Sequence, residues 1–218
     1  MNLPFTAEQF LSVFERYNQS VWPFQIVLNL LALGPLYLAI KPIRASNRII
    51  GGVLAILWVW IGVAYHLAFF ASINPGAKIF EAACIIQGML FGFYGVFRPQ
   101  LAFAYRTNAY TLTGLLFILF GLILYPLLGF LPGHVYPKAP TFGLPCPTTI
   151  FTFGLLLWTS ARVPRMVLVI PLLWSLVGFT AALSLGIRED TGLLVAGVVG
   201  SALVIYRDSR TSKPASAA

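Results

Sequence analysis

The sequence predicts an all-α protein, a bundle of seven transmembrane helices with its N-terminus outside and its C-terminus in the cytoplasm. Three observations predict this fold. The chain is 59% hydrophobic and only 9% charged, whereas a soluble domain carries about 25% charged residues. Its apolar residues gather in long stretches, and the short segments between them alternate in charge. The seven stretches are residues 22–40, 49–71, 77–97, 109–131, 148–161, 166–186 and 191–206.

The alternation of charge predicts the orientation, because Lys and Arg concentrate in cytoplasmic loops. Most of the 14 basic residues fall on one side of the predicted bundle. These are Lys41, Arg44, Arg48, Arg98, Arg106, Arg162, Arg165, Arg207, Arg210 and Lys213. The acidic residues, except Asp208, fall on the other side together with Arg16, Lys78, Lys138 and Arg188.

The number of spans follows from the same pattern. A helix needs roughly 20 apolar residues to cross a hydrocarbon core of ~30 Å, and the stretches at 148–161 and 191–206 are shorter. Without the fifth span, Arg162, Arg165 and the basic tail would face outward. We therefore predict seven spans, and six spans with a re-entrant segment at 148–161 is the alternative.

The chain begins with a segment that we expect to lie on the outer membrane surface. Thr6 and Gln9 have the spacing of a capping box, which starts a helix. Phe10 and Phe14 then follow at helical spacing. The pattern predicts an amphipathic interfacial helix over about residues 6–18. We expect residues 1–208 to form a single transmembrane domain and residues 209–218 to be a disordered tail.

Small residues line two of the predicted spans. Gly88 and Gly92 stand four apart in the third span, and Gly192, Ala196 and Gly200 share one stripe of the last. Such seams let helices approach closely. They predict close contacts inside the bundle or with a partner. The expected partners are the lipid bilayer and, through the glycine seams, a second copy of the chain or another membrane protein.

The longest predicted connection is external, residues 132–147, and it contains five prolines. Because proline restricts the backbone, we expect this loop to be ordered. His134 and Tyr136 are its candidate functional residues if it acts as a lid over a site. A rigid spacer across the outer surface is the alternative.

Polar side chains within the spans gather in the outer half when depth is counted at about 1.5 Å per residue. Such groups are costly in a membrane and usually face protein or water. We therefore expect an outward-facing cavity that carries a ligand or proton pathway. The predicted pathway residues are His66, Glu81, Gln87, Gln25, Asn29 and Tyr125.

His66 and Glu81 fall at matching depth on consecutive antiparallel spans. A carboxylate beside an imidazole can carry a proton or hold a cation. In the alternative, Glu81 is satisfied by its helix N-terminus and by Lys78, three residues before it. His66, Glu81 and Cys84 are also the candidate ligands of a metal site, and Cys84 and Cys146 are a candidate disulfide.

Several function classes lack support. The chain has no H-E-x-x-H motif, no P-loop and no G-x-S-x-G motif, so the sequence leans against an enzyme, and it leaves any cofactor unidentified. The net charge of +8 falls mainly on the predicted cytoplasmic rim, where anionic headgroups attract it. No basic domain with interleaved aromatic residues is present, so we expect no nucleic-acid binding.

Three stretches of the chain resemble an uncharacterised family of bacterial multi-pass integral membrane proteins, a domain of unknown function. They are PFTAEQFLSVFERYNQSVWP (4–23), YHLAFFASINPGAKIF (65–80) and GHVYPKAPTFGLPCPTTIFTFGLL (133–156). The resemblance covers nearly the whole chain. It implies a bacterial cytoplasmic (inner) membrane location, and it implies no activity.

These observations favour a protein that binds or transports a small solute, a cation or a proton through an outward-facing cavity. A structural subunit or assembly factor of a larger membrane complex is the alternative. A membrane enzyme, with a cofactor that the sequence does not reveal, is the third hypothesis.

Overall fold

The structure of the chain is a computed structural model that describes residues 3–130, 133–187 and 190–210. Within these ranges its regular structure is helical, with no β-strand. The α-helices are α1 (Ala7–Val21), α2 (Phe24–Ile40), α3 (Ser46–Trp60), α4 (Ala77–Phe91), α5 (Ala109–Leu119), α6 (Tyr125–Leu128), α7 (Pro145–Leu157), α8 (Met166–Leu185) and α9 (Thr191–Arg210). The predicted all-α class is confirmed.

Three π-helical segments extend these α-helices. η1 (Ile61–Leu67) continues α3, η3 (Gly92–Phe97) continues α4, and η4 (Phe120–Leu124) joins α5 to α6. A short 3-10 segment, η2 (Phe70–Ser72), follows η1. A π-helix bonds residue i to residue i+5, so the side chains that follow it point to a different face from the one that an α-helix would give. His66 lies in η1.

Five continuous helices are long and apolar enough to cross a membrane. They are Ser46–Ser72, Ala77–Phe97, Ala109–Leu128, Met166–Leu185 and Thr191–Arg210. Helices α1 and α2 pass the same test together, but they meet at a bend of 88°, and α7 is apolar but shorter. Each predicted apolar stretch coincides with one of these segments. Large apolar side chains such as Leu30, Ile79 and Leu112 are exposed on the helix surfaces, as a lipid environment requires.

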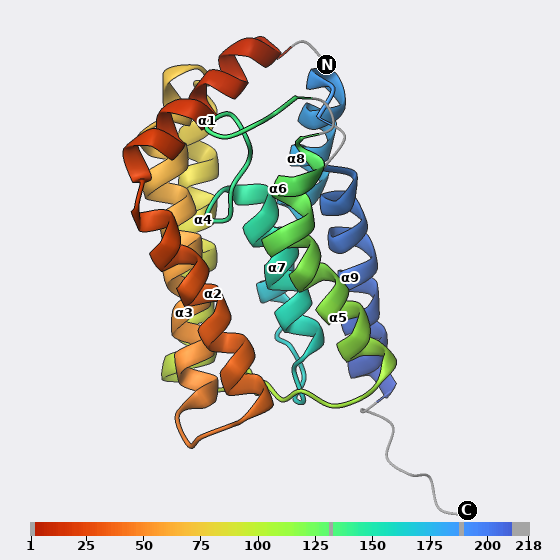
Figure 1. Cartoon of the computed structure of the whole chain (residues 1–218). Coiled ribbons are helices and arrows are strands. Elements are labelled where there is room, and N and C mark those ends of the chain that lie inside the picture. Colours follow the sequence, from red (N-terminus) through yellow and green to blue (C-terminus); the bar gives the residue numbers. More distant parts are fainter. Residues whose placement is uncertain (1–2, 131–132, 188–189, 211–218) are drawn as a thin grey trace, which may run out of the picture.

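The two ends of the bundle differ in their covering (Figure 1). Helix α1 lies across one end, which we call the α1 end. At the opposite end lie the connections from α2 to α3, from α4 to α5 and from α7 to α8, together with the last turn of α9. These segments carry the basic residues Lys41, Arg44, Arg98, Arg106, Arg162, Arg165, Arg207 and Arg210. We call this the basic end.

Helix α7 is the central element of the bundle (Figure 1). Every residue of α7 except Cys146 is buried, and the helix contacts α3, α5, α8, α9 and η4. Its 13 residues extend about 20 Å at ~1.5 Å per residue, less than the ~30 Å core of a bilayer. The predicted fifth span is therefore a short helix enclosed by its neighbours.

Glycines allow α5 to approach α7 closely. A Cβ atom on Gly154 would lie 2.7 Å from the carbonyl oxygen of Gly114, and one on Gly114 would lie 2.6 Å from that of Gly154. Farther along, a Cβ atom on Gly121 would lie 2.6 Å from the carbonyl oxygen of Pro147. These oxygens belong to the backbone, which cannot relieve a clash by changing rotamer as a side chain can.

Three glycines of the predicted seams, Gly88, Gly192 and Gly200, pack inside the chain. A Cβ atom on Gly88 would lie 2.9 Å from the carbonyl oxygen of Ala55 in α3. Gly51 and Gly95 meet where α3 contacts η3, and a Cβ on Gly51 would lie 2.6 Å from the Gly95 Cα. Gly92 has no such neighbour within 4 Å. On the last helix, Gly192 faces Phe120 and Gly200 faces Phe153.

The N-terminal helix begins as predicted. The Thr6 amide donates to Gln9 Oε1 at 2.8 Å, and the Gln9 amide donates to Thr6 Oγ1 at 3.2 Å, so the capping box forms. The helix continues to Val21 rather than ending near residue 18, and its last buried residues are Tyr17 and Asn18. At the other terminus α9 extends to Arg210, so the prediction that the disordered tail begins at residue 209 is wrong for Ser209 and Arg210. The rest of the predicted tail, 211–218, lies outside the described residues.

Replacing Gly154 by Ala tests the α5–α7 contact. We expect Gly154→Ala to lower the free energy of unfolding by about 1–3 kcal/mol, because overpacking against backbone forces the helices apart. Gly34→Ala in α2 is the matched control, since nothing lies within 4 Å of its Cβ position and Ala is the better helix former. Thermal unfolding in detergent, followed by circular dichroism, measures both. Equal unfolding temperatures for the two variants would contradict the tight contact.

Candidate functional site

A cavity of about 250 Å³ lies at the α1 end, between the N-terminal segment, α1, α4 and α8. We call it the α1-end cavity. Its walls are mostly apolar and include Phe5, Phe10, Phe70, Phe80 and Trp174. A second cavity of about 30 Å³ shares Phe10, Phe70 and Trp174 with it and continues toward the start of α7. The two spaces thus form one region beneath α1.

A polar cluster lies at the edge of this region. It consists of Asp190, Tyr125 and Cys146, and we call it the Asp190 cluster. Asp190 is only 4% exposed, and the Tyr125 hydroxyl donates a hydrogen bond to its Oδ1. The Cys146 thiol lies against both side chains. Asp190 and Cys146 line the α1-end cavity, so one side of a mostly apolar space carries a carboxylate and a thiol. Asn74 and Thr180 are the other polar residues of its lining.

Three separate elements bring the Asp190 cluster together. Asp190 directly precedes α9, where the positive end of the helix dipole favours a carboxylate. Tyr125 begins α6, directly after the π-helical segment η4. Cys146 stands in the first turn of α7 and is the one residue of that helix that is not fully buried.

His66 lies behind the cavity wall. Its side chain is 0% exposed, and neither ring nitrogen has a hydrogen-bond partner within the described ranges. The imidazole packs against four aromatic rings, with centroid distances of 5.0 Å to Trp174 and 5.6 Å to Phe80. The rings of Phe70 and Tyr65 complete this shell.

The structure does not bring His66 and Glu81 together as an ion pair. Glu81 is half-buried, and no ion pair joins it to His66 or Lys78 in the described part of the chain. Cys84 is buried against η1 near Gly62. Among the described residues no group of three His, Cys, Asp or Glu side chains is placed to hold a metal ion. Cys84 and Cys146 are both free thiols.

Gln25 and Asn29 are occupied in holding the proline-rich loop and their own helix. The Asn18 side-chain amide donates from Nδ2 to the backbone carbonyl oxygens of Pro137 at 2.6 Å and Ala139 at 2.8 Å. Gln25 donates to Asn18 Oδ1 at 2.7 Å, and Asn29 donates to the backbone of Gln25 at 2.8 Å.

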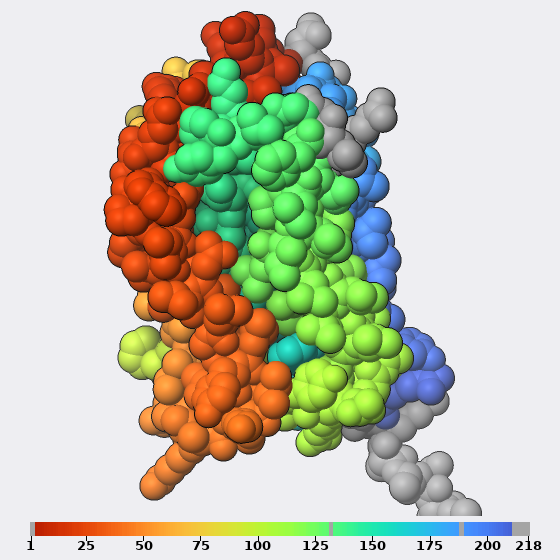
Figure 2. All heavy atoms as spheres, viewed as in Figure 1, coloured from red at the N-terminus to blue at the C-terminus, as the bar shows by residue number. Residues whose placement is uncertain are grey.

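The rest of the predicted loop and pathway residues have structural contacts too. The Tyr136 hydroxyl contacts the Asn18 carbonyl oxygen at 3.5 Å, and the His134 amide donates to the Gly129 carbonyl oxygen at 2.7 Å. The loop thus lies fastened between α1–α2 and α6 (Figure 2). Gln87 is fully buried and donates to the Val167 carbonyl oxygen at 3.0 Å, which ties α4 to α8. Of the predicted pathway residues, Tyr125 belongs to the Asp190 cluster.

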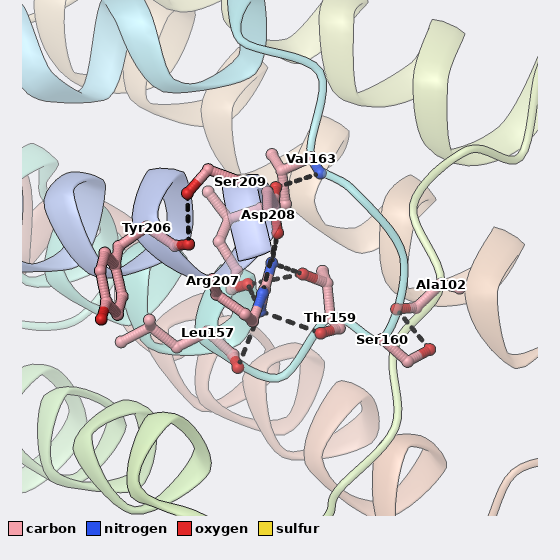
Figure 3. A network of polar contacts seen from close by, with 10 residues as sticks. Ala102, Leu157, Thr159, Ser160, Val163, Tyr206, Arg207, Asp208 and Ser209 are labelled. Atoms are coloured by element: carbon pink, nitrogen blue, oxygen red, sulfur yellow. Dashed lines mark hydrogen bonds and ion pairs between the residues drawn. The ribbon is translucent and has the colours of Figure 1, made fainter. Parts of the chain in front are cut away.

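A second polar network lies at the basic end (Figure 3). The Arg207 guanidinium donates to the carbonyl oxygens of Leu156, Leu157 and Thr159 at 3.3, 3.2 and 2.9 Å. Arg207 Nη2 also forms an ion pair with Asp208 Oδ1 at 2.8 Å. The other carboxylate oxygen, Asp208 Oδ2, accepts a hydrogen bond from the Val163 backbone N–H at 2.8 Å. Arg207 therefore caps the C-terminus of α7, where the helix leaves carbonyl groups without partners.

A cavity of about 260 Å³ adjoins this network. We call it the basic-end cavity. Its lining includes Arg106, Asn108 and Ser160, together with Arg207 and Asp208. Segments from α5, α7 and α9 surround it, so α7 borders a cavity at each of its ends.

Sequence reasoning missed four residues of these sites. Asp190 stands at the border of a predicted span, where the sequence pattern shows only a charge in a loop. Arg207 and Asp208 likewise show in the pattern only as charges on one side of the membrane. Trp174 lies in the apolar 166–186 stretch, where a tryptophan carries no signal of its own. The helix-start position of Asp190, directly before the last apolar stretch, was the one signal available.

The family of the chain follows from comparison with known proteins. The family of unknown function DUF6064 matches residues 7–215, from the first residue of α1 to beyond the end of α9. The chain belongs to this family. The DUF6064 match includes every residue of the Asp190 cluster and of the Arg207 network. No curated protein matches the chain, and no solved structure matches it.

Membership of DUF6064 confirms the resemblance to a family without an established activity. The bacterial inner membrane location stays a prediction. The cavities and polar groups of this DUF6064 protein are therefore the main indication of its function.

Replacing Asn18 by Ala tests the attachment of the loop. The loop 133–144 contains one site for trypsin, Lys138, which is exposed. We expect Asn18→Ala to raise the rate of cleavage after Lys138 about tenfold, because losing a buried hydrogen-bonding group costs about 1–3 kcal/mol. Gln19→Ala is the control, since Gln19 is exposed on the same helix. Limited proteolysis with mass spectrometry measures the rates, and equal rates would show that Asn18 does not hold the loop.

Replacing Arg207 by Met tests the cap of α7. We expect Arg207→Met to lower the free energy of unfolding by about 2–4 kcal/mol, because Asp208 and three carbonyl groups lose their donor in a buried setting. Arg210→Met removes a charge from the same turn of α9, where the guanidinium lies over the Tyr206 ring at 4.7 Å, and should cost less than about 1 kcal/mol. Denaturant unfolding compares them. A larger effect at Arg210 would be inconsistent with the cap.

Proposed function

We propose that this protein spans a cell membrane with the α1 end outside, and that it binds a small, largely apolar solute in the α1-end cavity as the first step of its transport. The observation that carries the proposal is the cavity itself, about 250 Å³ with aromatic walls and a buried carboxylate at its edge. An apolar cavity of about 150 Å³ holds a benzene molecule. The α1-end cavity is therefore of a size for a two-ring molecule.

The charge distribution supports the proposed orientation. The connections at the basic end, together with the last turn of α9, carry most of the Lys and Arg residues of the described chain. Such segments face the cytoplasm in most membrane proteins, which puts α1 and its cavity on the outer side. In a bacterium that side is the outer face of the inner membrane.

The pair of cavities supports transport as the purpose of binding. The α1-end cavity reaches α7 at Cys146, and the basic-end cavity reaches it at Leu157. Between them the bundle is closed by fully buried aromatic side chains, among them Phe151 and Phe153. A protein that opens these two cavities in turn would move a solute from one side to the other. The Asp190 cluster would then be the place to couple a cation or a proton to that movement.

The contacts between helices give no support to the structural-subunit hypothesis. That hypothesis uses the glycine seams and the outer N-terminal helix as contacts, and of the seam residues Gly88, Gly192 and Gly200 have their close contacts within the chain. The apolar outer surface needs only lipid as its partner.

The proposal is tested by filling the cavity. Ala181 lines the α1-end cavity, so Ala181→Phe adds a ring to the space that the solute needs. We expect purified wild-type protein to bind tritiated 2-acetylnaphthalene saturably in a scintillation proximity assay, and Ala181→Phe to bind it at least about tenfold more weakly, as the loss of roughly 1.4 kcal/mol would give.

Leu183→Phe is the matched control for this experiment. Leu183 lies two residues away on α8 and is 64% exposed, so the same ring added there leaves the cavity open. Wild-type affinity in this variant, together with unchanged unfolding temperatures in both, would assign the loss to the cavity. Equal binding by wild type and Ala181→Phe would contradict the proposed site.

A further inference from the structure

The α1-end cavity is partly open to the outside of the protein. Of the described residues that line it, three are exposed, and the others are buried or half-buried. The exposed ones are Pro4 of the N-terminal segment and Val177 and Thr180 of α8. Residues that both border a cavity and lie on the outer surface mark the place where the cavity opens. We call these three residues the cavity mouth.

The α8 side of the mouth belongs to the face of that helix that points away from the bundle. Leu173, Val177, Thr180 and Leu183 are all exposed, and their spacing of three or four residues places them on one stripe of the helix. Helix α8 is one of the helices long and apolar enough to cross a membrane. In a membrane this stripe contacts lipid chains, so the cavity opens toward lipid rather than toward water.

The position of the mouth along α8 gives its depth. Thr180 and Val177 precede the last residue of the helix, Leu185, by five and eight residues. At ~1.5 Å per residue these steps correspond to about 8 and 12 Å, and half of a ~30 Å hydrocarbon core is about 15 Å. In the orientation proposed above, the mouth therefore faces the hydrocarbon of the outer leaflet.

The polar side chain at the mouth is satisfied within its own helix. The Thr180 hydroxyl donates to the Val177 carbonyl oxygen at 2.8 Å. One turn farther on, the Ser184 hydroxyl donates to the Thr180 carbonyl oxygen at 3.1 Å. A polar group without a partner is costly in hydrocarbon, and these hydroxyls need no water as a partner. The mouth is thus compatible with contact to lipid chains.

The side of the cavity toward the end of the bundle is covered by aromatic rings. The Phe5 ring lies 5.8 Å from the Phe10 ring and 5.4 Å from the Phe70 ring, and Phe5 is only 7% exposed. Helix α1 lies across this end of the bundle (Figure 1). A solute arriving from the water would have to separate these rings, whereas a solute arriving from the membrane meets the open side.

We propose that the solute of the α1-end cavity is a molecule dissolved in the membrane, which enters sideways from the hydrocarbon of the outer leaflet through the cavity mouth. This inference rests on the proposed function and names the class and source of the solute that the same cavity takes. The solute is a lipid-soluble, mainly hydrocarbon molecule, and the bilayer is the phase from which it is drawn.

A photolabel that cannot leave the bilayer tests this route on the wild-type protein. The protein is reconstituted in vesicles that contain phosphatidylcholine with a diazirine midway along one acyl chain. Phe70 is only 5% exposed, and Cys146 lies in the enclosed helix α7, and both line the cavity. A lipid chain reaches them only by entering the cavity. We expect light-induced crosslinks to both, located by mass spectrometry, beside crosslinks to lipid-facing Leu183.

Competition and a narrowed mouth make the test specific. Excess 2-acetylnaphthalene should reduce the crosslinks to Phe70 and Cys146 but not those to Leu183. Val177→Trp should reduce them at least about tenfold, because an indole at the mouth occupies space that densely packed neighbours cannot yield. Leu183→Trp is the matched control, since Leu183 lies on the same stripe, is 64% exposed and does not line the cavity. It should keep the wild-type crosslinks to the cavity residues.

The possible failures are distinguishable. Crosslinks confined to lipid-facing residues, or cavity crosslinks that excess ketone does not reduce, overturn the entry from the membrane. Saturable binding of the ketone in the same preparation then leaves the proposed function standing. Undiminished crosslinks to Phe70 and Cys146 in Val177→Trp overturn the assignment of the mouth. Absence of saturable ketone binding contradicts the proposed function and, with it, this inference.

Discussion

The enclosure of α7 is the constraint on which the rest of the structure depends. A helix surrounded by other helices in an apolar interior has no water to satisfy the carbonyl groups at its C-terminus. In this protein the Arg207 side chain, from the last turn of α9, provides the donors for Leu156, Leu157 and Thr159. The same enclosure requires glycine where α5 crosses α7. A charged residue and several glycines thus serve one buried helix.

The short length of α7 also explains why a cavity exists at the α1 end. Because the helix begins only at Pro145, it leaves space beneath α1 that a full-length span would occupy. The loop 133–144 fills part of that space and is held there by Asn18. The remainder becomes the cavity, with Cys146 of α7 facing it and Asp190 at its edge. The candidate site is therefore a consequence of the architecture around α7.

The sequence predicted the elements better than it predicted the contacts. Apolar length, charge alternation and the Thr6–Gln9 capping box are local or cumulative signals, and the helices lie where they indicated. The direction of a single side chain is a different matter. Counting depth along an ideal helix put His66 opposite Glu81, but His66 lies in the π-helical segment η1, where the residue spacing around the helix axis changes. Asn18 and Trp174 acquire their importance from residues far away in the sequence, which no local pattern records.

The hydrogen bonds between Asn18 and the loop have a consequence for the order of assembly during synthesis. Asn18 and Ala139 are separated by 121 positions in the chain. At about 5–20 residues per second, a ribosome needs on the order of 10 s to make the intervening segment. During that interval α1 has left the ribosome, but the loop 133–144 that it will bind has not yet been made. A helix with one apolar and one polar face can lie in the headgroup region of a bilayer. The newly made α1 can therefore stay bound to the membrane surface until the loop 133–144 is made and forms its hydrogen bonds with Asn18.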